Sequence, residues 1–111
     1  MNSVVMKFGG TSVADADAIR RLTAIVSAQA ARSGAPPVVV VSAMSKVTDQ
    51  LLRMTADASR GERATISSGV DEIRRRHLAA IEALVPPPDR DAVSAEVEQQ
   101  IEELRAMLTA L

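Results

Sequence analysis

The chain has 111 residues, with 13 basic and 14 acidic side chains and a formal net charge of −1. This length fits one domain or part of a larger one, and the balanced charge gives no support for a nucleic-acid surface or a polybasic membrane anchor. With no Cys and a single His, the sequence excludes a disulfide framework and a cysteine-ligated metal site.

The first predicted element is a strand over Val4–Phe8, which is rich in β-branched residues and ends abruptly at Gly9–Gly10. These features are typical of a buried strand. Residues 11–14 are predicted to form a loop, and Asp15 is a plausible N-cap for the helix that follows. Apolar side chains at three- and four-residue steps predict that this amphipathic helix runs from roughly Ala16 to Ala31.

The second predicted strand is the all-valine run Val38–Val41, which follows a stop and turn at Ser33–Pro37. Apolar residues on both faces suggest an interior strand of a parallel sheet, so the segment reads as a right-handed βαβ unit. A loop over Ser42–Lys46 leads to a helix from near Val47 to about Ser59, and Gly61 is a reasonable terminator. The expected apolar contacts of that helix are Leu51, Leu52 and Met54.

An αα-hairpin is predicted for the remainder of the chain, with a proline turn at Pro86–Pro88. Its first helix covers Thr65–Leu84, although Gly69 lowers the helix propensity by about 1 kcal/mol. The apolar positions are Ile66, Val70, Ile73, Leu78, Ile81 and Leu84 in the first helix, and Val93, Val97, Ile101, Leu104 and Leu108 in the second. The pattern is still helical at Leu111, so we expect the chain to be cut rather than finished.

Two segments of the sequence are candidates for binding phosphate. The first is Lys7–Ser12, where adjacent glycines let the backbone approach an anion and adopt angles barred to other residues. Lys7 supplies a charge at the carboxyl end of its strand, where open α/β sheets bind ligands. The second segment, Ser42–Thr48, offers small hydroxyl donors at the same edge. A tight turn and ordinary helix capping are the simpler interpretations of the two segments.

The segment Lys7–Asp15 resembles the signature that opens aspartate kinases, which belong to the amino-acid kinase superfamily. Val39–Leu52 resembles their second block, at about the expected separation. On this resemblance the fold class is α/β, a partial amino-acid-kinase fold with a parallel βαβ unit followed by a helical hairpin. Residues 1–62 would form the βαβα part of one domain and residues 63–111 its hairpin insertion, with the domain truncated at 111.

The resemblance implies ATP-dependent phosphorylation of L-aspartate to 4-phospho-L-aspartate, the first step toward lysine, threonine and methionine. By the same resemblance Lys7 is catalytic, Thr48 helps to hold aspartate, and the ATP phosphates are bound by Lys7, Gly9, Gly10, Thr11, Ser12 and Ser42. Mg²⁺ is expected with ATP, although the sequence offers no identifiable protein ligands for it. The full-length protein is expected to be a cytoplasmic homo-oligomer without nucleic-acid or membrane partners.

The family pattern places further substrate-binding residues, the nucleotide-base site and regulatory ACT domains beyond Leu111. We therefore expect the 111 residues alone to be inactive. Two alternatives stay open: a non-catalytic interaction module built on the Thr65–Leu111 hairpin, or an amino-acid kinase with another acceptor. The amino-acid sequence of Lys7–Ser12 argues against a kinase with another acceptor.

Other polar residues have simpler structural interpretations. His77 is expected to be a partly exposed helix residue rather than a general base. Arg74–Arg76 are expected to form a solvated face that pairs with acids such as Asp71 and Glu72. The last predicted helix has several acidic residues, which are expected to lie on its polar side rather than to form a metal site: Glu96, Glu98, Glu102 and Glu103.

Overall fold

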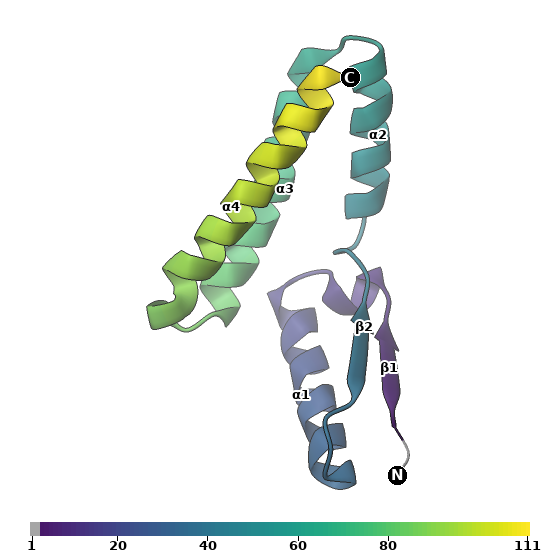
Figure 1. The fold of residues 1–111 in the computed structure, drawn as a ribbon, viewed down its shortest axis with the longest axis vertical. Helices are drawn as coiled ribbons and strands as arrows, with labels where there is room; N and C mark the ends of the chain where they lie inside the picture. Colours follow the sequence, from purple (N-terminus) through teal and green to yellow (C-terminus); the bar gives the residue numbers. More distant parts are fainter. Residues whose placement is uncertain (1–2) are drawn as a thin grey trace. The chain divides into compact units, whose positions relative to one another are not determined.

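Two strands, a 3-10 turn and four α-helices make up the computed structural model, which describes residues 3–111 (Figure 1). In chain order they are β1 (Val5–Phe8), η1 (Gly10–Val13), α1 (Ala16–Ser33), β2 (Val38–Val41), α2 (Val47–Ser59), α3 (Arg63–Leu84) and α4 (Pro87–Ala110). They group into two compact units, the first ending at Lys46 and the second beginning at Val47. The predicted parallel βαβ unit and helical hairpin are both confirmed.

The sheet of the first unit consists of β1 and β2 paired in parallel, with Val5 opposite Val38 and Phe8 opposite Val41. The pairing extends one step at each end. The Val38 N–H donates to the Val4 carbonyl at 2.9 Å, and the Ser42 N–H donates to the Phe8 carbonyl at 3.1 Å. Both strands therefore end together at one edge of the sheet.

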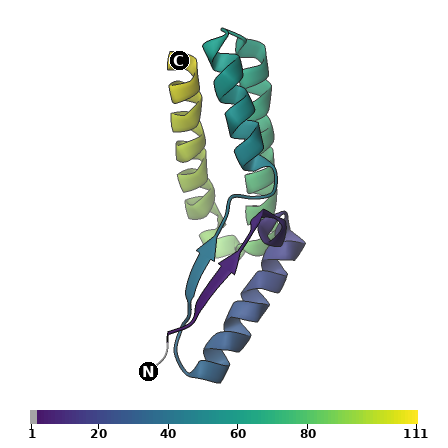
Figure 2. The same cartoon turned by 90° about the vertical axis from the view of Figure 1, so that its right-hand side faces the viewer.

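Helix α1 connects the two strands and lies alongside the sheet (Figure 2). Its first turn is capped by the Asp15 carboxylate, which accepts the Ala18 N–H at 2.9 Å as predicted. The helix runs two residues beyond the predicted end and stops at Gly34, whose φ of 71° is a left-handed C-cap. Ala18 and Leu22 are buried beneath the helix.

The prediction that both strands are buried is wrong for the described residues. The four valines of β2 are 39–55% exposed, and along β1 the side chains alternate between exposed and half-buried. Within residues 3–46, α1 is the only long element beside the sheet, and it can cover only one face. The valine run predicted the strand correctly, but within residues 3–46 no second layer covers the face with Val38 and Val40. On the α1 face, Val39 and Val41 are still 39% and 55% exposed.

The segment predicted as a loop after Gly10 is instead the short 3-10 turn η1. The Ser12 N–H closes it by donating to the Gly9 carbonyl at 3.0 Å, and Val13 is buried at its end. A 3-10 turn is a frequent lead into an α-helix, and here it carries the chain from β1 to the Asp15 cap.

The second unit contains three helices, in which α3 packs against both α2 and α4 (Figure 1). The bounds of α2 and the end of α3 agree with the prediction. The buried side chains of the three helices include Met54, Ile66, Val70, Ile73, Ile81, Ile101 and Leu108. The prediction that Leu52 lies on the packed face of α2 is wrong, since its side chain is 65% exposed. Leu52 is two residues from buried Met54, and two residues of an α-helix correspond to a rotation of about 200° around its axis.

Gly69 lies inside a continuous α3 and does not interrupt it. A Cβ at this position would overlap the Met54 Sδ and would lie only 2.9 Å from Met54 Cγ. The glycine therefore lets α2 and α3 approach each other closely, which offsets its poor helix propensity.

The hairpin turn uses its prolines to begin α4. The Val85 N–H donates to the Ile81 carbonyl at 2.8 Å and ends the bonding of α3, while Pro86 is the N-cap of α4 and Pro87 its first residue. Proline suits the first turn because the N–H that it lacks has no partner inside the helix there.

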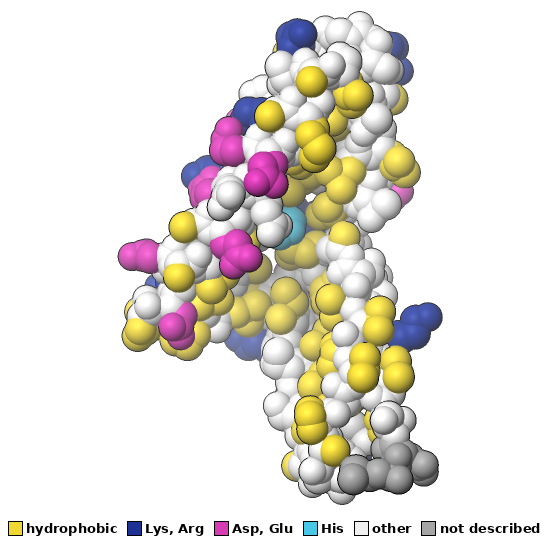
Figure 3. All heavy atoms as spheres, in the orientation of Figure 1, with side chains coloured by type: hydrophobic (Ala, Val, Ile, Leu, Met, Phe, Trp, Pro, Cys, Tyr) yellow, Lys and Arg dark blue, Asp and Glu magenta, His cyan; other side chains and the backbone are white. Residues whose placement is uncertain are grey.

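Ion pairs also join the two helices of the hairpin. Arg74 pairs with Glu98 at 2.6 Å, and Arg105 pairs with Asp71 at 2.9 Å. The predicted local pairing holds for Arg75 and Glu72, at 2.7 Å, whereas Arg74 pairs across the hairpin instead. Figure 3 shows the acidic side chains spread along α4, as expected for its polar side.

Candidate phosphate-binding site

Two loops leave the sheet at the same edge, as the sequence predicted. Phe8 and Val41 are the last paired residues of the two strands, so Gly9 and Ser42 begin their loops opposite each other. The Ser42 N–H bond to the Phe8 carbonyl holds the start of the second loop beside the first. The carboxyl edge of a parallel sheet is where ligands of open α/β folds bind.

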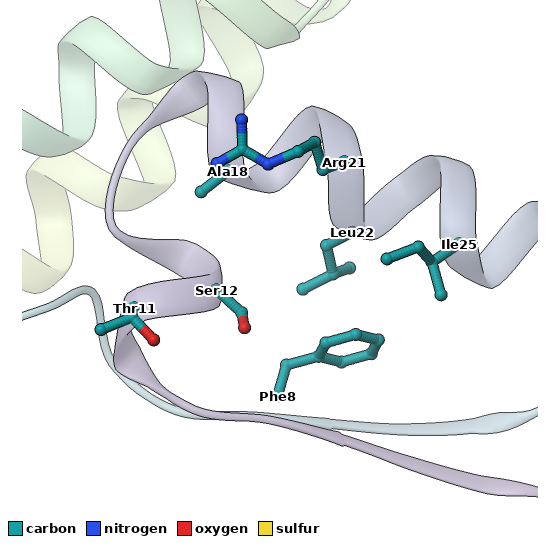
Figure 4. Close-up of a pocket in the computed structure, with 7 residues that line it drawn as sticks. All are labelled: Phe8, Thr11, Ser12, Ala18, Arg21, Leu22 and Ile25. Carbon is teal, nitrogen blue, oxygen red and sulfur yellow. The ribbon is translucent and has the colours of Figure 1, made fainter.

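Lys7 projects from the face of the sheet that α1 does not cover. Side chains alternate along a strand, and Phe8 points toward α1 (Figure 4), so Lys7 points to the other face. Lys7 is paired with Val40, and Ser42 follows two residues after Val40 while the hydrogen-bonded ladder continues. Lys7 and Ser42 therefore lie on the same face, with the Lys7 side chain exposed.

The backbone of η1 offers hydrogen-bond donors next to Lys7. The Gly9 carbonyl accepts the Ser12 N–H, so it points into the turn. The first N–H groups of a helical turn have no partner within the turn, which applies here to Gly10 and Thr11. Converging backbone N–H groups of this kind bind anions, and Lys7 adds a positive charge nearby.

Neither Gly9 nor Gly10 adopts a left-handed backbone conformation, and of the two only Gly10 lies in a confined space. Gly9 is extended, with φ −78° and ψ −179°, and the positive-φ glycines among residues 3–111 are Gly34 and Gly61. The prediction that the adjacent glycines adopt angles barred to other residues is therefore wrong for Gly9 and Gly10. At Gly10 a Cβ would lie 3.4 Å from both the Ala43 carbonyl oxygen and Ser45 Cα, so the two loops are in close contact.

Ser12 lies on the other side of the sheet from Lys7. With Phe8 and α1 it lines a hollow of about 230 Å³, into which its hydroxyl points (Figure 4). The full lining is Phe8, Thr11, Ser12, Ala18, Arg21, Leu22 and Ile25. The assignment of the Ser12 hydroxyl to the ATP phosphates stays a prediction, and this hollow is separate from the face that carries Lys7.

Thr48 is exposed in the first turn of α2, within the second compact unit. Its predicted contact with aspartate stays a prediction. His77 is half-buried in α3, as expected for a helix residue, and its Nδ1 lies 2.7 Å from the Ile73 carbonyl oxygen.

Neither a metal centre nor a membrane span is evident in the described part of the chain. Among residues 3–111, no three His, Cys, Asp or Glu side chains are grouped so that they could hold a metal ion. No helix there combines the length and the apolar character needed to cross a bilayer.

The chain is similar in sequence to a known protein family and to known aspartokinases. A profile of the amino acid kinase family matches residues 2–110. The aspartokinase of Rickettsia felis is 42% identical over 59 residues, which cover 53% of this chain and 14% of that protein. Lysine-sensitive aspartokinase 3 of Escherichia coli is 35% identical over 107 residues, covering 96% of this chain and 22% of that protein. The chain thus spans less than a quarter of the length of these relatives.

Solved structures of an aspartokinase are also similar to this chain. E. coli aspartokinase III in complex with lysine and aspartate has a TM-score of 0.77 at 34% identity, covering 97% of this chain and 22% of that one. The same enzyme in complex with aspartate and ADP has a TM-score of 0.78 at 33% identity, covering 98% and 22% of the two chains.

Proposed function

This chain belongs to the amino acid kinase family, and from that membership we propose that it supplies the ATP-phosphate loops of an aspartokinase. The reaction is phosphorylation of the side-chain carboxylate of L-aspartate by ATP, which gives 4-phospho-L-aspartate and ADP. The observation that carries the proposal is the pair of loops at one sheet edge, with Lys7 and Ser42 on one face. The similarity to an aspartokinase in complex with aspartate and ADP supports the choice of substrates.

The chemistry requires charge stabilisation more than covalent participation by the protein. An oxygen of the aspartate carboxylate attacks the γ-phosphorus while the bond from that phosphorus to the bridging oxygen of ADP breaks. Negative charge is spread over the oxygens of the transferring group and of ADP. We assign the Lys7 ammonium, the loop backbone at Gly9 and the N–H groups of Gly10 and Thr11 to these oxygens, because preorganised donors lower the barrier without rearranging.

The remaining residues have supporting roles in the proposal. Ser42 shares the face of Lys7 and contributes a hydroxyl to the phosphates, and Thr11 adds a donor from η1. The Ser12 hydroxyl would have to turn out of the hollow beside α1 to reach the phosphates. Thr48 helps to hold aspartate. Mg²⁺ would neutralise phosphate charge, with ATP oxygens among its ligands, as is usual for Mg²⁺ bound with a nucleotide.

The proposal extends to the biological setting that the family implies. Product formation would be the first step toward lysine, threonine and methionine, in the cytoplasm, in a homo-oligomeric enzyme. Residues 1–62 and 63–111 would be parts of one kinase domain, although α2 packs with the hairpin in the second compact unit.

A chimaera tests the proposed function directly. In it, this chain replaces the matching segment of E. coli aspartokinase 3, with which it aligns over 107 residues. Hydroxylamine traps acyl phosphates as hydroxamates, so ATP-dependent formation of aspartyl hydroxamate is the expected result. Glutamate in place of aspartate is the control for the acceptor. A folded chimaera that forms no hydroxamate, beside an active parent enzyme, would contradict the proposal.

A second candidate function is supported by the surface of the helical unit. Leu52 and Met107 are large apolar side chains that are 65% and 63% exposed. An interaction module would use such a surface. Sedimentation of residues 47–111 would test it, since a strictly monomeric unit argues against assembly through these helices.

A further inference from the structure

We propose that Gly10 and Lys46 are positioning residues that hold the β2–α2 loop against the phosphate loop. Gly10 does so by lacking a side chain, and Lys46 does so by adopting a left-handed backbone conformation. The inference rests on the proposed function for its effect on catalysis, but the contact between the loops can be tested independently of any activity.

A methyl group at Gly10 would already be in van der Waals contact with the second loop. A Cβ there would lie 3.4 Å from the Ala43 carbonyl oxygen and from Ser45 Cα, and 3.7 Å from the Ser45 nitrogen. These are van der Waals distances to backbone atoms, which cannot rotate aside as a side chain can. Alanine at this position should therefore fit, whereas any further branch would push the second loop away. Nothing lies within 4 Å of a Cβ at Gly9, so the limit is specific to Gly10.

Lys46 ends the same loop in a conformation that is uncommon for a residue with a side chain. Its φ is 69°, and it is the one non-glycine residue with positive φ in the described part of the chain. Such a conformation persists only where the surrounding structure requires it, and it is frequent at functional sites. Here it lies immediately before α2 and directs the chain from the packed segment into that helix.

The two features act on one short segment, Ala43–Ser45. Ser42, just before this segment, is tied to β1 through the Phe8 carbonyl, Gly10 faces the first and last residues of the segment, and Lys46 follows it. The separation between the first loop and Ser42 is therefore set by backbone geometry. Because both loops are proposed to contact the same phosphates, a displacement of one relative to the other should weaken binding and transfer together.

The loop contact is tested by NMR on the 111-residue chain. Gly10→Val should strongly shift the amide resonances of Ala43 and Ser45, while Gly10→Ala should shift them little. Ala28→Val adds the same side chain at an exposed site on α1 and is the matched control. Equal shifts for Gly10→Ala and Gly10→Val, or none for either, would overturn the role of Gly10.

Lys46 is tested by a pair of substitutions that separates its backbone from its charge. Asparagine tolerates a left-handed φ whereas β-branched valine does not, and neither carries an ammonium group. Lys46→Asn should leave the Ala43 and Ser45 amide signals in place, and Lys46→Val should move them. This pair tests the role of Lys46 even if Gly10→Val fails to fold. Similar spectra for Lys46→Asn and Lys46→Val would overturn the backbone role.

The catalytic consequence is measured in the chimaera described above. Gly10→Val and Lys46→Val should each lower kcat/KM for ATP by about 10²-fold, as expected for a misplacement of about 1 Å. Lys46→Asn should retain most of the parent value. If the unsubstituted chimaera is inactive, the proposed function fails and the NMR results alone decide the loop contact. If it is active and the valine variants match it, the positioning roles fail while the function stands.

Discussion

Lys7 is the residue on which the proposed chemistry depends most. Its side chain is exposed on the uncovered face of the sheet, so its removal should not disturb packing. Lys7→Ala in the chimaera is expected to lower kcat by at least about 10²-fold, the usual effect of removing one charge-stabilising donor. Circular dichroism should show an unchanged fold.

Lys7→Met distinguishes the charge from the aliphatic stem of the side chain. Because methionine keeps the stem and loses the ammonium, its turnover should fall as far as that of the alanine variant. Turnover close to the parent value in either variant would refute the catalytic role of Lys7.

Replacing Gly69 by alanine is expected to destabilise the protein, although alanine has the higher helix propensity. Gly69→Ala should gain about 1 kcal/mol of helix propensity, yet the new Cβ would overlap buried Met54. Overpacking of a core costs about 1–3 kcal/mol, so we expect a net loss of unfolding free energy in urea titrations. Ser67→Ala, at an exposed site on the same helix, is the matched control and should be neutral or slightly stabilising. A stabilised Gly69→Ala chain would show that the Met54 side chain or α2 readily moves away.

At the scale of the helices, the Arg74–Glu98 ion pair predicts that the stability of the folded state depends on pH. The hydrogen bond from Arg74 lowers the pKa of Glu98 below its ordinary value of 4.5 and raises the pKa of Arg74. A carboxylate with a depressed pKa in the folded state stabilises that state above its unfolded pKa. This stabilisation is lost as the pH falls from about 4.5 through the lower folded pKa.

Thermal unfolding between pH 7 and pH 2 would measure this effect on α3 and α4. The difference in Tm between the parent and Glu98→Gln should be present at neutral pH and should disappear in acid. Glu96→Gln, at an exposed glutamate on the same helix, is the control and should leave the Tm unchanged. A difference that persists at pH 2 would assign the effect to packing rather than to ionisation.

The elements differ in how much their sequence reveals about them. The bounds of α2 and the cap at Asp15 were predictable because periodicity and capping are local properties. The η1 turn was missed because Gly10–Val13 is too short to show a period. The exposure of Val38–Val41 was missed because burial depends on what covers a strand, which its own residues do not specify.

The candidate site, too, was predictable only where local sequence determines the structure. That the loops after Phe8 and Val41 share one sheet edge follows from parallel pairing, and it was predicted. The direction of the Ser12 hydroxyl and the contact of Gly10 with Ser45 depend on tertiary placement, so the sequence offered no signal for them. The left-handed Lys46 was equally unpredictable, since lysine rarely adopts that conformation.

At the scale of the whole chain, the uncovered sheet face predicts self-association. Val5, Val38 and Val40 share that face and are 59%, 55% and 45% exposed. Exposed apolar strands with open edges pair readily with other chains. The 111-residue chain should therefore show a concentration-dependent increase in mass in sedimentation experiments.

Substitution on this face should reduce that association. Val38→Thr with Val40→Thr keeps β-branched residues in the strand while making the face more polar, and it leaves Lys7 untouched. Ala24→Thr and Ala28→Thr on the exposed surface of α1 are the matched control pair. An unchanged association of the strand variant would locate the contact elsewhere.

The register between β1 and β2 has a consequence for how length variation in this chain should be interpreted. A residue inserted near the Gly34 cap lengthens only the connection between α1 and β2, so the paired ends of the strands are undisturbed. A residue inserted between Val38 and Ser42 turns Ser42 to the opposite face and separates it from Lys7. Natural insertions and deletions should therefore be common at the α1–β2 turn and absent from the four residues of β2.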